Sequence, residues 1–566
     1  MIAKVTPLIR LPSTTDVFDY FVPDDLAAAV KPGSLVSIPF RASKAAGVVL
    51  GLSAAQEEPK KFRARPVDSL IEDEPVLSES QLRLIEEFSQ YYFVSTGSVA
   101  RLVVPDRPSR PAHVKPSAFN CTRFTVSPIQ LPLLKKAAER ISSAQFLTIQ
   151  DVSSFVWLVL HLIKHSPQSQ ILILIPTIEM IEAITPAVHK MCSGKLAVAH
   201  SKLSKGQRWN EYQNILSGNA RAILATRQGV FLPIRENSHI IFFDGTSEDF
   251  KQYDQHPRYD ARIVGAWLAK ITKSKLLFAS SSEVIGNGDM THFPSSRGRG
   301  LGVLLVDMKN EMNQKGFSII AGRTIEAIRG ALKQNKKAVV IALREESEKG
   351  VSVKSVIKLL TEELKNCKVG GEMGGFDILV CTPHALEGLK LSSEKRNLGL
   401  LVFASIEPLL AIPDYRSAER AYYRLSHWRM LAQELGFERI ILQSYSPDSP
   451  AVRAFAYGEF EAFRNEELKH RKELNYPPFS KLIKLSYNPR HTGGVLADSI
   501  SADDRQDSIA SELRSSLQND GTVAGPFTDA RKRQSLLIKL SPGAKLPMLA
   551  ELGPDWIIDR DPENVL

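Results

Sequence analysis

Short apolar runs alternate with segments of helical periodicity through most of the chain. Between residues 145 and 285 the runs ILILIP, KLAVAH, ARAILAT, HIIFFD and KLLFAS are separated by segments such as MIEAITPAVHKM and RWNEYQNIL. The pattern restarts near residue 300 with VLLVDM, KAVVIAL, FDILVCT, LLVFAS and RIILQS. Near-continuous apolar strands that alternate with helices are typical of a parallel sheet covered on both faces. The sequence therefore predicts two α/β domains in tandem.

The two ends of the chain carry different patterns. The N-terminal part has short runs such as LVSIPF and AAGVVLGL, each bounded by Gly or Pro, which predicts a small β-rich domain. One long helical stretch over residues 450–474 is expected to stop at Pro477 and Pro478. Beyond it, KLIKLSY, SLLIKLS, WIIDRDP and a helix near residues 507–517 predict a small α+β domain. The predicted divisions are 1–105 (β-rich), 106–144 (connector), 145–298 and 299–474 (α/β), and 475–566 (α+β).

Charge favours a polyanionic partner, because the formal net charge is +10 and the pI is about 9.2. The connector is especially basic, with eight Lys or Arg against two Asp or Glu between Arg101 and Arg140. Such a run can lie on a phosphate backbone or simply be solvated.

Composition also bounds the compartment and the metal chemistry. The apolar runs are far shorter than the roughly 20 residues of a membrane span. The N-terminal MIAKVTPLIR lacks the apolar stretch of a signal peptide, so we expect a cytoplasmic protein. Cys121, Cys192, Cys367 and Cys381 form no CxxC pair or Cys/His cluster, which predicts reduced structural thiols and no zinc site.

Residues 145–163, QFLTIQDVSSFVWLVLHLI, lie where an α/β nucleotide-binding domain has its phosphate loop. That loop needs glycines whose N–H groups curl around the phosphates, a Lys, and a Ser or Thr hydroxyl for Mg²⁺. The segment has no glycine and no usable lysine, and β-branched residues disfavour the positive φ that glycine adopts freely. The positions are taken by Ile149, Val152, Ser154, Phe155 and Val156.

Several further strings occur in one order along nearly the whole chain. VFDYFVPDDL, KPGSLVSIPF, GVVLGL and EDEPVL come first, followed by residues 200–208, 225–227 and the KQ…PRY.AR string of residues 251–262. Residues 412–420, 476–479 and the terminal 559–562 complete the series. This series resembles the PriA family of replication-restart helicases. The resemblance implies a 3′-DNA-end-binding β domain, two RecA-like lobes and a small α+β C-terminal domain.

Within that resemblance the ATPase motifs are lost. Where the family has Asp-Glu-Glu-His, the chain has residues 244–247, DGTS, which keep one carboxylate and lose the general base. Residues 279–282 match the Gly-Ser-Ala-Thr motif only weakly, and residues 427–433 replace the stretch that supplies an arginine finger. The eight-cysteine zinc segment that follows a strand like residues 338–343 is also missing. Phosphoryl transfer depends on positioning and electrostatics, so we expect no ATP, Mg²⁺ or Zn²⁺ and assign no catalytic residue.

The resemblance places DNA-end recognition in the N-terminal domain. The family receives a terminal nucleotide and its 3′-hydroxyl in a small pocket, and the matching positions are Phe18, Asp19 and Arg65. An aromatic ring can stack on a base, a carboxylate can accept from a hydroxyl, and a guanidinium can hold a phosphate. Arg41 takes a position that is often Gly in the family and either crowds the pocket or adds a phosphate contact. The alternative is that Phe18 is a core residue and Asp19 a turn residue.

We therefore expect a DNA-binding fork-recognition and primosome-assembly factor on a helicase-shaped scaffold without ATPase activity. By the resemblance, its partners are forked DNA with a 3′ end, primosome proteins, single-strand DNA-binding protein and the replicative helicase. Two alternatives stay open: an active ATP-dependent 3′–5′ helicase with substitute motifs, and a protein-interaction scaffold with non-specific DNA affinity.

Overall fold

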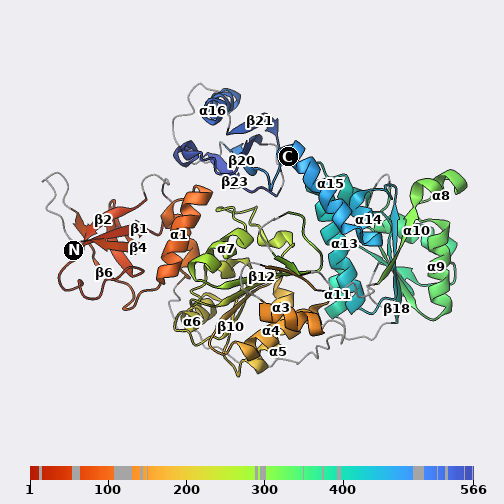
Figure 1. Ribbon diagram of the computed structural model, residues 1–566, viewed down its shortest axis with the longest axis horizontal. Helices are drawn as coiled ribbons and strands as arrows, with labels where there is room; N and C mark the ends of the chain where they lie inside the picture. The colour runs from red at the N-terminus through yellow and green to blue at the C-terminus, as the bar shows by residue number, and fades with distance from the viewer. Residues whose placement is uncertain are drawn as a thin grey trace.

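The computed structural model contains four parts (Figure 1). The N-terminal sheet lies at the left, the first α/β lobe in the centre and the second lobe at the right, with the C-terminal domain above the first lobe and its end next to α15. The structure describes residues 1–566 except 10, 12–15, 54–63, 107–130, 141–144, 150, 287–290, 294–300, 348–349, 372–374, 392–396, 489–501, 519, 530–532, 553–554, 564 and 566.

The N-terminal domain is a curved six-stranded sheet in the order β5-β2-β1-β4-β3-β6. Only β2 and β5 pair in parallel; the other neighbours are antiparallel. Its inner face holds a small core that includes Val5, Tyr20, Val36 and Ile38. The strands are β1 (Ile2–Pro7), β2 (Phe18–Phe21), β3 (Leu35–Phe40), β4 (Ser43–Ser53), β5 (Arg65–Pro66) and β6 (Ser69–Leu70).

Two helices, α1 (Glu79–Tyr92) and α2 (Thr96–Val103), join this sheet to the first lobe. Ser78 and Gln81 form a capping box that satisfies the free N–H groups at the start of α1. Leu84, Ile85 and Phe88 on α1 share one hydrophobic core with residues of the first lobe. The N-terminal domain is therefore fixed to the first lobe through buried apolar side chains.

The first lobe is a parallel sheet in the order β13-β7-β12-β11-β8-β10-β9, with helices on both faces. The fully buried β8 and β11 lie at its centre, which is why their sequences are apolar except for His239 at the start of β11. Its elements are α3 (Leu131–Arg140), β7 (Gln145–Thr148), α4 (Val152–His165), β8 (Ile171–Leu174), α5 (Ile178–Met191), β9 (Leu196–Ala199), α6 (Lys205–Leu216), β10 (Ala222–Ala225), η1 (Arg227–Phe231), β11 (His239–Phe243), η2 (Glu248–Phe250), α7 (Ala261–Ile271), β12 (Lys275–Ser280) and β13 (Thr291–Phe293).

The second lobe repeats this architecture with a parallel sheet in the order β14-β19-β18-β15-β17-β16. The predicted helix over residues 450–474 is two helices, because Gly458 takes a φ of 77° in the left-handed region and ends the first. Its elements are β14 (Gly302–Asp307), α8 (Met308–Lys315), α9 (Gly322–Lys333), β15 (Lys337–Ile341), α10 (Val353–Glu363), β16 (Val369–Gly370), β17 (Ile378–Cys381), α11 (His384–Leu391), β18 (Leu398–Phe403), α12 (Glu407–Leu410), α13 (Ser417–Glu434), β19 (Arg439–Ser444), α14 (Pro450–Tyr457) and α15 (Phe460–Glu473).

The C-terminal domain is an antiparallel sheet in the order β21-β22-β20-β23, packed against one long helix. The sequence pattern misses β21, in which Gly525 and Pro526 interrupt the strand and the pairing shifts register. The elements are β20 (Lys481–Tyr487), α16 (Ala502–Leu517), β21 (Gly521–Thr528), β22 (Gln534–Leu540), η4 (Pro547–Glu551) and β23 (Trp556–Arg560). The predicted fold class, a β-rich N-terminal domain, two parallel-sheet lobes and a small α+β domain, is confirmed.

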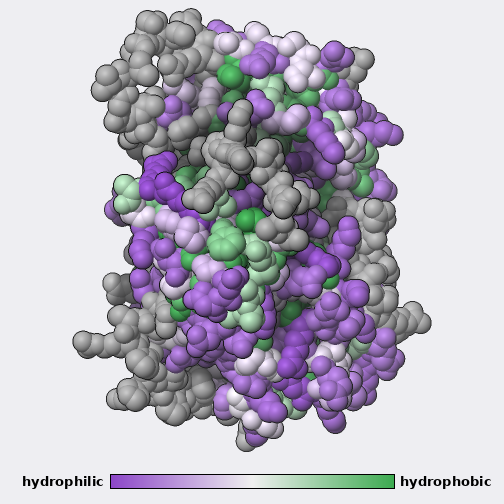
Figure 2. Space-filling view, turned by 90° about the vertical axis from the view of Figure 1, so that its left-hand side faces the viewer, coloured by the Kyte–Doolittle hydropathy of each residue, from purple (hydrophilic) through white to green (hydrophobic). Residues whose placement is uncertain are grey.

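The face of the molecule on the N-terminal side is mostly hydrophilic, with hydrophobic residues near its middle and smaller groups of them elsewhere (Figure 2). Within the described ranges, no helix combines the length and the apolar character needed to cross a membrane.

Candidate functional site

The predicted DNA-end residues lie at the edge where β5 meets β2. Phe18 is the first residue of β2 and its ring packs edge-on against Phe40, with 5.5 Å between ring centroids. Arg65 is the first residue of β5, pairs with Tyr20 in the sheet and is exposed. The structure therefore brings the aromatic ring and the guanidinium to one end of the sheet.

Arg41 belongs to the same group through its backbone. It lies in the tight turn between β3 and β4 and has a φ of 54°, in the left-handed region that favours glycine. The Nη1 atom of Arg65 donates to the carbonyl oxygen of Arg41 at 3.2 Å, and the Arg41 guanidinium lies 5.7 Å from the ring centroid of Phe40. Both arginines are exposed to solvent, and their guanidinium groups can donate to phosphate oxygens.

Asp19 does not join this group. Successive residues of a strand point to opposite faces, so Phe18 and Tyr20 face the small core while Asp19 and Phe21 are exposed on the outer face. Lys4 is the cross-strand neighbour of Asp19 and is exposed as well. Phe18 is half-buried and packs against the domain core, which agrees with part of the alternative core role.

Sequence reasoning missed Phe40 and Tyr20, which complete the inner group. The ring of Phe40 contacts both the ring of Phe18 and the guanidinium of Arg41. The hydroxyl of Tyr20 donates to the carbonyl of Pro39 at 3.1 Å, which links β2 to the end of β3. The alternation of β2 contained the signal for Tyr20, because it lies two residues after Phe18. The contact with Phe40 joins β2 to β3, which are not neighbours in the sheet, and it has no local signal.

The segment that replaces the phosphate loop is packed shut. Phe155 is fully buried, and its ring lies 4.3 Å from that of Phe243 at the end of β11. Asp151 caps α4 by accepting from the backbone N–H of Ser154 at 2.6 Å. The backbone N–H of Val152, the first residue of α4, donates to the carboxylate of Glu434 on α13 of the second lobe. Carboxylates therefore occupy the helix N-terminus where a phosphate would otherwise bind.

The strand end that follows β11 is also closed. Asp244 has a φ of 51°, and its Oδ2 atom lies 3.1 Å from Nδ1 of His427 on α13. Burial favours a higher pKa for Asp244, but His427 and Thr246 outweigh it and the pKa lies below its ordinary value. A Cβ atom added to Gly245 would lie 2.9 Å from the ring of Phe278, so the glutamate of the family motif has no room there. These residues do not fit a nucleoside triphosphate and Mg²⁺.

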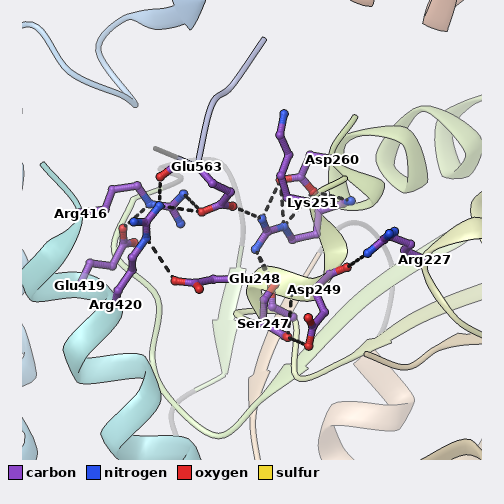
Figure 3. A network of polar contacts seen from close by, with 12 residues as sticks. Arg227, Ser247, Glu248, Asp249, Lys251, Asp260, Arg416, Glu419, Arg420 and Glu563 are labelled. Atoms are coloured by element: carbon purple, nitrogen blue, oxygen red, sulfur yellow. Dashed lines mark hydrogen bonds and ion pairs between the residues drawn. The ribbon is translucent and has the colours of Figure 1, made fainter. Parts of the chain in front are cut away.

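Around this closed site, one carboxylate joins three domains (Figure 3). Glu563, just after β23, lies 3.3 Å from Arg262 on α7, 3.2 Å from Arg416 and 2.8 Å from Arg420. Burial would raise the pKa of Glu563, but Arg416, Arg262 and Arg420 outweigh it and lower that pKa to about 2. Glu419 adds a second carboxylate, 3.0 Å from Arg416. These arginines are therefore already neutralised within the protein.

The segment before Glu563 adds buried contacts with the first lobe and α1. Lys251 is fully buried, lies 2.9 Å from Asp559 and donates to the carbonyl of Arg560 at 2.6 Å. Tyr91 of α1 donates to Asp561 at 2.8 Å, and the guanidinium of Arg560 lies 3.7 Å from the Tyr91 ring centroid. Three strings that carried the family resemblance, residues 251–262, 412–420 and 559–562, thus meet at one joint.

Most of the predicted basic connector, including Arg110 and Cys121, lies outside the described residues. In the part of the chain that the structure describes, no group of three or more His, Cys, Asp or Glu side chains could hold a metal ion.

Comparisons with known proteins agree with the sequence motifs. Residues 8–105 match the family model for the PriA 3′DNA-binding domain (3′BD). "Replication restart protein PriA" of Synechocystis sp. is 23% identical over 411 residues, which cover 56% of this chain and 49% of that protein. The protein of the same name from Rickettsia conorii is 25% identical over 572 residues, 86% of this chain and 85% of the relative. The chain thus spans about half the length of the Synechocystis relative and most of the Rickettsia relative.

Solved helicase structures are also similar. The match to RecG bound to a three-way DNA junction covers 62% of this chain and 47% of the RecG chain, with 13% identity and a TM-score of 0.36. The match to the DUF1998 helicase MrfA bound to DNA covers 74% of this chain and 61% of the MrfA chain, with 13% identity and a TM-score of 0.37.

Proposed function

We infer the function of this chain from the premise that it is a relative of the replication restart proteins PriA. We propose that it is a replication-restart DNA-binding protein that recognises forked DNA with a 3′ end and helps to reload the replicative helicase. Primosome proteins and single-strand DNA-binding protein are the partners that this role requires. The chain performs this role without hydrolysing ATP.

The proposal rests on one observation within the matched 3′ domain: exposed Arg41, bonded through its carbonyl to exposed Arg65, lies beside the ring of Phe40, against which the half-buried ring of Phe18 packs. Phe18 offers a face for the terminal base, and the two guanidinium groups can hold the adjacent phosphate. Because Phe18 begins β2, a nucleotide at that strand end can reach both faces of the sheet, which leaves Asp19 available to accept from the terminal hydroxyl.

The test is a fluorescence titration of three DNAs: a fork ending in a 3′-hydroxyl, the same fork ending in a 3′-phosphate, and plain duplex. Wild-type protein should bind the hydroxyl fork most tightly. Arg65→Ala should weaken both forks about ten- to a hundredfold, since one charged hydrogen bond is worth roughly 1.5–3 kcal/mol. Asp19→Ala should weaken only the hydroxyl fork.

The matched control is Lys31→Ala, which removes an exposed cation of the same domain at the opposite end of β3 from Arg41. It should reduce binding to all three DNAs equally and only slightly. Equal wild-type affinity for the two fork ends would contradict the end-recognition role and leave a generic basic surface.

The loss of ATPase activity is tested in the same samples. ATP turnover on fork DNA should stay at the level of a protein-free control, because the phosphate-binding lysine and the general base are both replaced. DNA-stimulated turnover that Asp244→Ala abolishes would favour the active-helicase alternative instead.

A further inference from the structure

One face of α13 contacts the first lobe along most of its length. Arg420, Arg424, His427, Met430 and Glu434 follow one another at intervals of three or four residues, which places them on one side of a helix. In Figure 1, α13 runs along the boundary between the two lobes.

Every one of these residues has a partner in the first lobe. Arg420 and Arg424 lie 3.2 Å and 2.7 Å from the carboxylate of Glu248. Farther along the helix, His427 reaches Asp244, and Met430 is buried in the core that contains Phe155. At the end of α13, Glu434 accepts from the N–H of Val152. The row therefore combines ion pairs, a buried apolar contact and a helix cap.

The contacts of His427, Met430 and Glu434 fall on the place that a nucleotide would take. The positive end of a helix attracts a phosphate, and here the carboxylates of Asp151 and Glu434 lie at the start of α4. A triphosphate at this position would find the Val152 N–H already bonded to Glu434 and would be repelled by the two carboxylates.

We propose that α13 is a built-in occupant of the site between the lobes, and that it holds both lobes in one fixed arrangement whether or not nucleotide is present. An ATP-driven helicase must change the relation between its lobes in each cycle, whereas this chain keeps one arrangement. Separating the lobes would leave Asp244, which is only 8% exposed, without His427. The proposal goes beyond the proposed function, since it does not depend on whether the N-terminal domain binds a 3′ end.

The test measures the distance between the lobes in the full-length protein. Fluorophores are introduced at Lys270 on α7 and Lys333 on α9, both exposed, and single-molecule energy transfer is recorded. Wild type should give one narrow distribution that does not change with ATP, with a non-hydrolysable ATP analogue or with fork DNA. Two populations, or a shift caused by nucleotide, would overturn the proposal without any variant.

Variants test the role of α13 itself. Glu434→Ala combined with His427→Ala should broaden the distribution, and Glu434→Ala alone should speed hydrogen exchange at the Val152 amide about tenfold. Glu438→Gln is the control, because Glu438 pairs at 2.7 Å with Lys336 inside the second lobe, and both readouts should match wild type. A double variant with the wild-type distribution, or unchanged Val152 exchange in Glu434→Ala, would refute the role given to α13. DNA titration of the same samples separates these outcomes from a failure of end recognition.

Discussion

The arginines at the N-terminal edge and those at the joint between the lobes differ in their exposure and in their partners. Arg41 and Arg65 are exposed, and the side chain of Arg65 is held by a backbone carbonyl. Arg416 and Arg420 are largely buried and already face the carboxylate of Glu563. A guanidinium can recruit a DNA phosphate only if no carboxylate has neutralised it. In this protein the pairing of each arginine, and not net positive charge alone, therefore decides which guanidinium groups are open to the proposed DNA contact.

Removal of Glu563 should have the largest effect, because it frees the arginines of the joint from their shared carboxylate. Glu563→Ala leaves three guanidinium groups without a shared carboxylate, and the loss of one partner of a buried ion pair costs about 3–5 kcal/mol. We expect a lower thermal unfolding midpoint of the full chain and unchanged DNA affinity of the folded protein. Glu461→Ala is the control, because its pair with Arg464 is exposed and such pairs are worth about 0–1 kcal/mol. Equal effects of the two changes would mean that the joint is no stronger than a surface pair.

Acid should weaken the joint in a defined range. The pKa of Glu563 is lowered from 4.5 to about 2 in the folded protein, so its contribution is complete above about pH 4.5 and is lost as the pH falls toward 2. The difference in unfolding midpoint between wild type and Glu563→Gln, measured over this range, should shrink as the solution becomes more acid. A difference that stays constant between pH 5 and pH 2.5 would contradict the ionised state of Glu563.

Arg41 offers the smallest and sharpest test, because one change affects stability and binding in different directions. Arg41→Gly removes a non-glycine residue from a φ of 54°, which relieves roughly 1 kcal/mol of conformational cost. It also removes an exposed cation beside Phe40. We expect unchanged or slightly higher stability of the N-terminal domain, together with fork affinity that is a few-fold lower. Lower stability would mean that the Arg41 side chain supports the turn, and unchanged affinity would exclude it from the DNA contact.

The sequence by itself determined five strands in each lobe, but not the short β7, β13 and β16. The fully buried β8 and β17 are continuous apolar runs, because burial on both faces of a parallel sheet leaves no face for polar residues. It also determined that the phosphate loop is missing, because glycine and lysine are required there by local backbone geometry and charge. The break at Gly458 could have been read from the glycine itself.

Only the tertiary structure decided what fills the site between the lobes and which arginines remain free. Glu434 reaches Val152 across 282 positions of the chain, and Glu563 reaches Arg262 across 301. Hydrophobic periodicity is a local signal, whereas an ion pair of this kind depends on how whole domains pack and on which side chains lose their water. The sequence could name Phe18, Asp19, Arg41 and Arg65 together, but only the structure showed that β2 begins at Phe18, so that its pleat turns Asp19 to the face opposite Phe18.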